Sequence, residues 1–142
     1  MNKKIIIIPV ILMIIAVGLS FNQSDKLSEK TVFHVTLADP NLYKNGVYSS
    51  TFTVNEGDYI LKFVPNGDSP QSLNILLKGD NYDFSENFKL NGTLHQTGIS
   101  EYYTWDYDGH KEISIPMEQT IIIEIDPNGN ELGSVSVDII EK

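Results

Sequence analysis

The chain has 142 residues and contains no cysteine. It therefore has no disulfide framework, no thiolate zinc site, no iron–sulfur cluster and no cysteine nucleophile. A bacterial-type lipoprotein anchor is excluded as well, because that anchor requires a cysteine at the processing site. Any folded domain must be held together by its own hydrophobic core, which a chain of this length is able to form.

Arginine is also absent, and acidic residues outnumber lysines by 19 to 10. Two of the lysines, Lys3 and Lys4, precede every acidic residue, so the rest of the chain is more acidic still. The backbone of a nucleic acid repels such a chain, and arginine, the usual bidentate ligand of phosphate, is missing. The composition argues against nucleic acid as a partner and predicts an acidic surface.

Motifs of catalysis are missing too. No nucleophile elbow, HExxH, P-loop or GxGxxG pattern occurs in the sequence. Acid pairs such as Glu112 and Glu118 are too common in an acidic chain to indicate a glycosidase. We therefore expect a protein that is not an enzyme and has no cofactor, apart from the Ca²⁺ considered below.

The first twenty residues have the pattern of an export signal. Lys3 and Lys4 precede residues 5–19, which are apolar and uncharged, and Gly18 and Ser20 place small residues before a cut after Ser20. An uncleaved signal anchor is the alternative, because the apolar stretch is near the shortest length that spans a bilayer. Residues 1–20 are thus expected to be a signal peptide or signal anchor, and residues 21–30 a polar tether. The remainder is expected outside the cytoplasm, either secreted or anchored by residues 5–19.

From residue 31 onward, apolar side chains recur at every second position, which is the pattern of half-buried β-strands. Clear runs cover residues 31–37, 51–54, 58–64, 73–77, 113–115, 121–125 and 135–139, with shorter candidates at 87–90 and 101–107. Turn-forming pairs such as Asn45-Gly46, Asn91-Gly92 and Asn128-Gly129 separate the runs. We predict that residues 31–142 form a single two-layer antiparallel β-sandwich, jelly-roll-like, with helix only in the N-terminal segment.

One part of the pattern resembles known modules. The hairpin Phe52-Thr-Val-Asn-Glu-Gly57-Asp-Tyr59-Ile-Leu-Lys-Phe63, followed by Leu73-Asn-Ile-Leu-Leu77, is similar to that of bacterial pre-peptidase C-terminal domains and emp24/GOLD-type domains. The whole chain also resembles small secreted archaeal β-sandwich proteins. The resemblance to the pre-peptidase and emp24/GOLD-type modules covers about 30 residues. It implies a sandwich with an accessory or binding role, and it carries over no catalytic residue.

The segment Tyr102-Tyr103-Thr104-Trp105-Asp106-Tyr107-Asp108 is the most distinctive stretch. On a strand, its odd-numbered aromatic residues point to one face, and Tyr102, Asp106 and Asp108 point to the other. One interpretation is an aromatic platform for sugar rings, with the two aspartates accepting hydrogen bonds from hydroxyl groups. The other is that Trp105 and a flanking tyrosine belong to the core, and the large share of core surface that aromatic residues bury favours this second interpretation.

A second candidate site is an acidic loop that places oxygen-bearing side chains at alternate positions, as Ca²⁺-binding loops do. The candidate ligands are Asp126, Asn128, Asn130 and Glu131, with Asp80 and Asp83 or Asp106 and Asp108 as additions. The loop lacks the sixth-position glycine and twelfth-position glutamate of an EF-hand. The alternative interpretation is a hairpin turn at Asn128-Gly129.

The histidines and two asparagine triplets are the remaining candidate sites. The three histidines, His34, His95 and His110, have no ligand spacing and are expected at the surface. Asn22 and Asn91 each begin an Asn-x-Ser/Thr triplet and are candidate glycosylation sites.

Together these features predict a non-catalytic binding or interaction module outside the cytoplasm, with a partner in the cell envelope or extracellular space. The most specific version of this prediction is that the ligand is a glycan, bound by Tyr102, Tyr103, Trp105 and Tyr107. One alternative is a structural envelope component that self-associates or packs on a surface layer. Another is a sandwich module stabilised by Ca²⁺.

Overall fold

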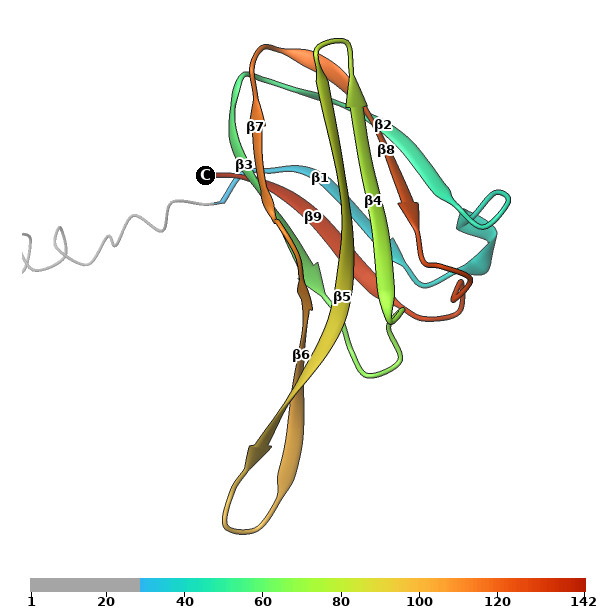
Figure 1. The fold of residues 1–142 in the computed structure, drawn as a ribbon, viewed down its shortest axis with the longest axis vertical. Coiled ribbons are helices and arrows are strands. Elements are labelled where there is room, and N and C mark those ends of the chain that lie inside the picture. Colours follow the sequence, from blue (N-terminus) through green and yellow to red (C-terminus); the bar gives the residue numbers. More distant parts are fainter. Residues whose placement is uncertain (1–28) are drawn as a thin grey trace, which may run out of the picture.

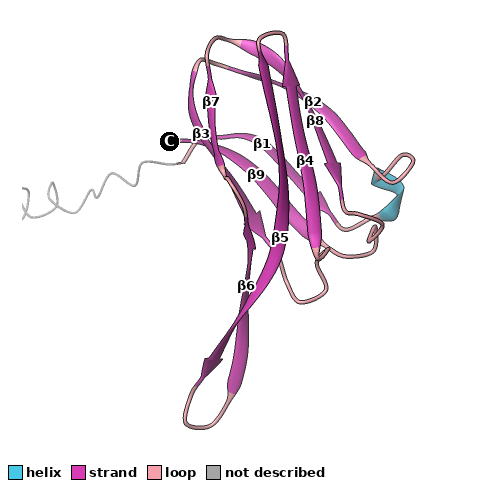
Figure 2. Cartoon of the chain, viewed as in Figure 1, coloured by secondary structure: helices cyan, strands magenta, loops and turns pink. Residues whose placement is uncertain are grey.

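The structure, a computed structural model, describes residues 29–142, and these form an all-β fold (Figures 1 and 2). The helix predicted in the N-terminal segment, the signal in residues 1–20, most of the tether and Asn22 lie outside the described residues. Within residues 29–142 the sole helical element is a short 3₁₀ turn, Pro40–Leu42, and no helix is long and apolar enough to cross a membrane. The nine strands are β1 (Thr31–Leu37), β2 (Tyr48–Val54), β3 (Gly57–Val64), β4 (Ser72–Gly79), β5 (Tyr82–Gln96), β6 (Glu101–Asp108), β7 (Glu112–Ile115), β8 (Gln119–Asp126) and β9 (Val135–Glu141).

The strands form two antiparallel sheets, as predicted. The four-stranded sheet has the order β1-β9-β3-β7, and the five-stranded sheet has the order β2-β8-β4-β5-β6. Strands β1 to β4 alternate between the two sheets, β4, β5 and β6 follow one another in the same sheet, and β7 to β9 alternate again. Neighbours in each sheet are therefore often distant in sequence, and the sheets are tied together by the chain itself.

The core lies between the sheets and follows the two-residue period of the sequence. Ile121, Ile123 and Ile125 of β8 are fully buried, while Ile122 and Glu124 between them are exposed. Burying each isoleucine contributes about 1.5–3 kcal/mol relative to leaving it in water. Aromatic rings join the sheets at both ends: the ring centroids of Phe33 and Phe52 lie 5.1 Å apart, and those of Phe63 and Phe88 lie 4.9 Å apart. Since both sheets and this core lie within residues 29–142, we expect that part of the chain to fold on its own.

The end of the predicted tether is held against the sandwich. Lys30 forms an ion pair with Glu141, its carbonyl accepts from the backbone N–H of the same residue, and Glu29 pairs with Lys62 at 2.5 Å. Residues 29 and 30 thus continue the path of β1.

Strand β5 is much longer than the expected run 87–90, since it extends from Tyr82 to Gln96. Asn91-Gly92 was expected to be a turn, but it lies in the middle of this strand. A Cβ atom at position 92 would lie 2.6 Å from Cζ3 of Trp105, its cross-strand partner. Glycine is required there because the indole ring covers the backbone, not because the chain turns.

The other two Asn-Gly pairs do turn. Asn45 and Gly46 have φ values of 52° and 84°, and Lys44 and Val47 on either side exchange two backbone hydrogen bonds. Asn128 and Gly129 have φ values of 52° and 89°. The interpretation of this second pair as a hairpin is nevertheless wrong, because the loop connects β8 in one sheet with β9 in the other.

Within residues 29–142, β4 pairs with β5 from Tyr82 to Lys89, and the backbone N–H of Leu90 donates to the carbonyl of Gln71 at 2.9 Å. Beyond Leu90, β6 is the sole strand of this part of the chain that pairs with β5. Residues 91–106 therefore form a two-stranded ribbon that projects from the sandwich (Figure 1). We call these residues the arm. Its tip is the turn 97–100, in which the backbone N–H of Thr97 donates to the carbonyl of Ser100 at 2.8 Å.

Candidate functional site

The arm presents aromatic side chains on both of its faces. On one face Tyr103 stacks on Trp105, with ring centroids 5.6 Å apart, and Leu94 lies opposite Tyr103. On the other face Tyr102 stacks on His95 at 5.0 Å, and His95 Nε2 is 2.8 Å from the hydroxyl of Thr104. This division of the aromatic residues between two faces agrees with the sequence pattern.

The first of these faces, which we call the Tyr103 face, has a fixed base and an exposed surface. Trp105 is half-buried: it lies on Gly92, and a Cβ atom at Gly67 in the β3–β4 loop would be 3.4 Å from its Cζ2. Tyr103 and Leu94, further along the arm, remain 54% and 42% exposed. The half-buried Trp105 ring and the two accessible side chains beside it form an exposed apolar surface.

Tyr107 is not part of this surface, although it was a candidate for it. Its side chain is fully buried in the core, and its ring centroid lies 5.1 Å from that of Phe63. Its hydroxyl donates to the carbonyl of Pro70 at 2.5 Å. Burial raises the pKa of this hydroxyl well above its ordinary value, and the Tyr43 hydroxyl adds to the rise. Tyr107 is thus the flanking tyrosine that belongs to the core.

Asp106 and Asp108 are exposed, but they lie on the face opposite Trp105. Both oxygens of Asp106 accept from the Lys111 ammonium, at 2.9 and 2.8 Å, and Asp108 accepts from the side-chain amide of Asn91 at 3.2 Å. They are therefore not placed to bind the hydroxyl groups of a ring that stacks on Tyr103. Asp68, which follows Gly67 in the loop against Trp105, is exposed, and the sequence pattern did not indicate it.

The tip of the arm carries one conspicuous apolar residue. Ile99 is 99% exposed, and it is held in a turn by hydrogen bonds between Thr97 and Ser100. A side chain this exposed contributes nothing to the core. Its position at the end of the arm adds to the exposed apolar surface of the arm.

The acidic loop uses its oxygens internally. Asp126 accepts from the backbone N–H of Asn128 at 2.8 Å, the Asn128 amide bonds Ser72 and Asn74, and Asn130 accepts from the N–H of Gly133 at 2.9 Å. Glu131 faces away from the others, towards Gly46 and Tyr43. Within residues 29–142 no three His, Asp or Glu side chains are grouped so that they could hold a metal ion, and Asp80, Asp83, Asp106 and Asp108 do not complete such a group.

The histidines and the glycosylation triplet are at the surface. His34 is exposed and its Nδ1 is 2.6 Å from the Asp138 carboxylate, whereas His110 lies beside the ring of Phe84, with centroids 6.4 Å apart. Asn91 is exposed on the Asp106 side of the arm. Its use as an acceptor remains a prediction.

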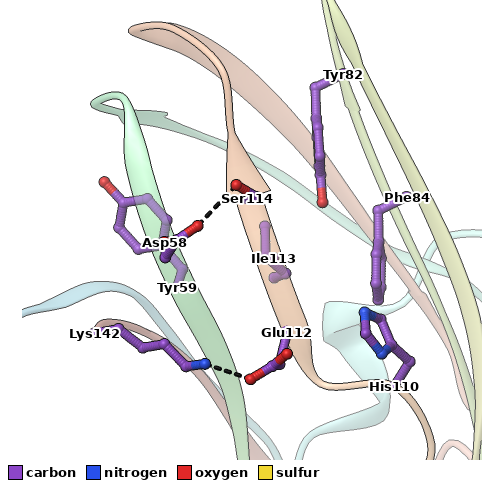
Figure 3. Close-up of a pocket in the computed structure, with 9 residues that line it drawn as sticks. All are labelled: Asp58, Tyr59, Tyr82, Phe84, His110, Glu112, Ile113, Ser114 and Lys142. Atoms are coloured by element: carbon purple, nitrogen blue, oxygen red, sulfur yellow. Dashed lines mark hydrogen bonds and ion pairs between the residues drawn. The ribbon is translucent and has the colours of Figure 1, made fainter.

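A second concave site was not indicated by the sequence. An open cleft of about 450 Å³ lies between β5 and β7 (Figure 3). It is lined by Asp58, Tyr59, Tyr82, Phe84, His110, Glu112, Ile113, Ser114 and Lys142. The Lys142 ammonium forms an ion pair with Glu112 and, through this hydrogen bond, holds the pKa of the Glu112 carboxyl below its ordinary value. These residues come from four distant parts of the chain, so no local motif could have revealed them.

Comparisons with protein-family models, with curated proteins and with solved structures found no significant match. The fold and the two sites define the class of this protein as a β-sandwich with a projecting arm, and function must be argued from the sites.

Proposed function

We propose that this chain is a non-catalytic binding module outside the cytoplasm, at the cell surface or in the envelope, and that the arm binds a glycan on the Tyr103 face. The observation that supports this proposal is the stacked pair Tyr103–Trp105, with the tyrosine 54% exposed on a ribbon that has no further strand partner within residues 29–142. Stacked rings stabilise such a ribbon, but they do not require the accessible surface that Tyr103 and Leu94 retain. An exposed apolar surface of this kind is suited to a ligand.

The charge of the protein narrows the class of glycan. Residues 29–142 carry 18 acidic residues and seven lysines. Their field disfavours sulfated or carboxylated sugars and favours neutral or amino sugars. The apolar face of a sugar ring would lie on Tyr103.

The strand order and the N-terminal segment support the rest of the proposal. The eight strands other than β6 follow the order of two interlocked Greek keys, which supports the jelly-roll winding. Sandwiches of this architecture include lectin domains. The export signal in residues 1–20 and the resemblance to pre-peptidase and emp24/GOLD-type modules support a binding role outside the cytoplasm. Mass spectrometry of the mature N-terminus tests whether the chain is released or anchored.

Tryptophan fluorescence tests the glycan site directly, because Trp105 is the only tryptophan in the sequence. We expect a panel of neutral and amino-sugar oligosaccharides to contain a ligand that shifts the emission of residues 29–142. Tyr103→Ala should weaken binding at least about tenfold, as expected for a central aromatic contact. Ile122→Ala, which removes an exposed apolar residue of β8 at a position paired with Lys78, is the matched control and should bind normally.

Two results would refute the glycan proposal. One is an unchanged emission with every oligosaccharide in the panel, together with no response on a glycan array. The other is a ligand whose affinity survives Tyr103→Ala but is lost in Tyr102→Ala, which would move the site to the opposite face of the arm.

A structural envelope component is the second candidate, and it is favoured by a different observation. Strand β6 is the outer strand of its sheet, and β5 is its sole partner within residues 29–142, so one row of its backbone groups is available to another chain. Light scattering after size exclusion distinguishes the two functions. A monomer of residues 29–142 at high protein concentration argues against self-assembly, and a concentration-dependent oligomer argues for it.

A further inference from the structure

The two sheets differ in strand number, and this difference leaves part of the inner face of β5 uncovered. The four-stranded sheet ends at β7, whereas the opposing sheet continues through β5 to β6. Tyr82 and Phe84 point to the inner face of β5, yet both are only half-buried. A fifth strand beside β7 would lie over these two rings, and residues 29–142 supply no such strand.

The open edge of β7 presents unpaired backbone groups to this space. Tyr59 faces Ile113 in the register, and the N–H of Leu61 donates to the carbonyl of Lys111, so the odd-numbered positions of β7 bond to β3. In an antiparallel pair the hydrogen-bonded positions alternate. The N–H and C=O groups of Glu112 and Ser114 must therefore point away from β3. Consistent with this, the carbonyl of Asp58, opposite Ser114, bonds to Lys142 instead of β7.

The cleft has the lining that an added strand would require. Its apolar wall comes from the inner faces of the sheets, with Tyr82, Phe84 and Ile113. Its polar wall comes from the outer face of β7 and its neighbours, where Ser114 donates to Asp58 at 2.7 Å. Figure 3 shows the rings of Tyr82 and Phe84 on one side of β7 and these polar side chains on the other. The alternating side chains of an extended segment would meet these two walls in turn.

The charged side chains around the cleft favour a basic ligand. Asp58 and Glu112 line it, and its one lysine, Lys142, is already paired with Glu112. Glu86 points to the same inner face as Phe84 and is only half-buried. The surplus of carboxylates suits a basic segment, and it disfavours a second copy of this chain, which carries the same acidic excess.

We propose that the cleft binds an extended, basic peptide segment of a partner protein, which adds to the four-stranded sheet as a fifth strand beside β7. Backbone hydrogen bonds to Glu112 and Ser114 supply general affinity, and side chains that alternate towards Phe84 and towards Glu112 supply selectivity. This site is independent of the glycan site proposed for the arm.

Amide hydrogen exchange of residues 29–142, followed by NMR, tests the proposal. In the free protein the amides of Glu112 and Ser114 should exchange fast, and those of Ile113 and Ile115 slowly. The probe is a synthetic peptide selected from a phage-displayed library of random dodecapeptides. On binding, it should slow the exchange of Glu112 and Ser114 by at least about tenfold.

Two variants test the walls of the cleft separately. Phe84→Ala removes part of the apolar wall, and Glu112→Lys reverses a charge on an exposed side chain without touching the core. Each should weaken the selected peptide at least about tenfold. Ile122→Ala, an exposed residue on the outer face of β8, is the control and should bind the peptide normally.

Several outcomes would overturn the proposal. They are a library that yields no binding peptide, a bound peptide that leaves the amides of Glu112 and Ser114 unprotected, and a peptide whose affinity is unchanged by Glu112→Lys. Protection of the same two amides in the peptide-free protein at high concentration, with a dimer in light scattering, would assign the edge to a second copy instead.

Discussion

Tyr107→Phe is the substitution that best tests how the base of the arm is held. The hydroxyl of Tyr107 is fully buried and donates to the carbonyl of Pro70 in the β3–β4 loop. Phenylalanine keeps the ring against Phe63 but leaves a buried carbonyl without a partner. An unsatisfied buried polar group costs about 1–3 kcal/mol. For a domain of 114 described residues this corresponds to a fall in Tm of roughly 4–12 °C.

Tyr43→Phe is a control of the same chemistry. The Tyr43 side chain is also buried, but its hydroxyl is the buried side-chain polar atom in residues 29–142 that has no hydrogen-bond partner. Removing it breaks no hydrogen bond, so we expect a change within about 0.5 kcal/mol or a slight gain in stability. Thermal and urea unfolding followed by circular dichroism measure both variants. Equal losses of stability in the two variants would show that the Tyr107–Pro70 hydrogen bond does not stabilise the fold.

Three further predictions concern the arm, alkaline pH and the acidic loop. Gly92→Ala should displace the Trp105 ring and shift its fluorescence emission to longer wavelength. It should also lower the free energy of unfolding by about 1 kcal/mol, because the overpacking against Trp105 outweighs the smaller gain from removing a glycine from a strand. Burial raises the pKa of Tyr43, Tyr59 and Tyr107, so above pH 10 the folded state keeps protons that the unfolded state loses. The free energy of unfolding should therefore be constant just below pH 10 and fall above it, by up to about 1.4 kcal/mol per pH unit for each of these tyrosines. Urea unfolding across that pH range measures the fall. The Tm should change by less than about 1 °C between excess Ca²⁺ and a chelator, since the loop oxygens already bond within the protein; a clear rise with Ca²⁺ would restore the metal site.

The strands could be predicted from the sequence because their signal is local. Each run of alternating apolar residues from residue 31 onward corresponds to a strand, and the sandwich follows because every strand has one apolar face to bury. Strand order could not be predicted in this way, because pairs such as β1 with β9 join residues about a hundred positions apart. Nothing in the local pattern of residues 31–37 specifies residues 135–139 as partners.

The sites were predicted only in part, and the reasons differ. The aromatic segment was recognised, but its tyrosines are chemically alike. Tyr103 and Tyr107 both lie opposite β5, and Tyr107 is buried while Tyr103 is exposed because the pairing of β4 with β5 ends at Lys89. The length of the arm was missed because Asn91-Gly92 has the composition of a turn. The cleft was missed entirely, because it depends on what β7 leaves uncovered, and an absent strand leaves no trace in the sequence.

Strand β5 contributes residues to both proposed sites, and its length keeps the two sites apart. It begins at the cleft with Tyr82 and Phe84 and ends in the arm with Leu94, the cross-strand neighbour of Tyr103. Ten residues separate Phe84 from Leu94, which corresponds to about 33 Å along a strand. Ligands at the two sites would not touch, and substitutions at such a separation act additively. Phe84→Ala should therefore weaken the peptide without changing glycan affinity, and Tyr103→Ala should do the reverse. Loss of both activities in either variant would mean that the arm and the cleft are parts of a single site.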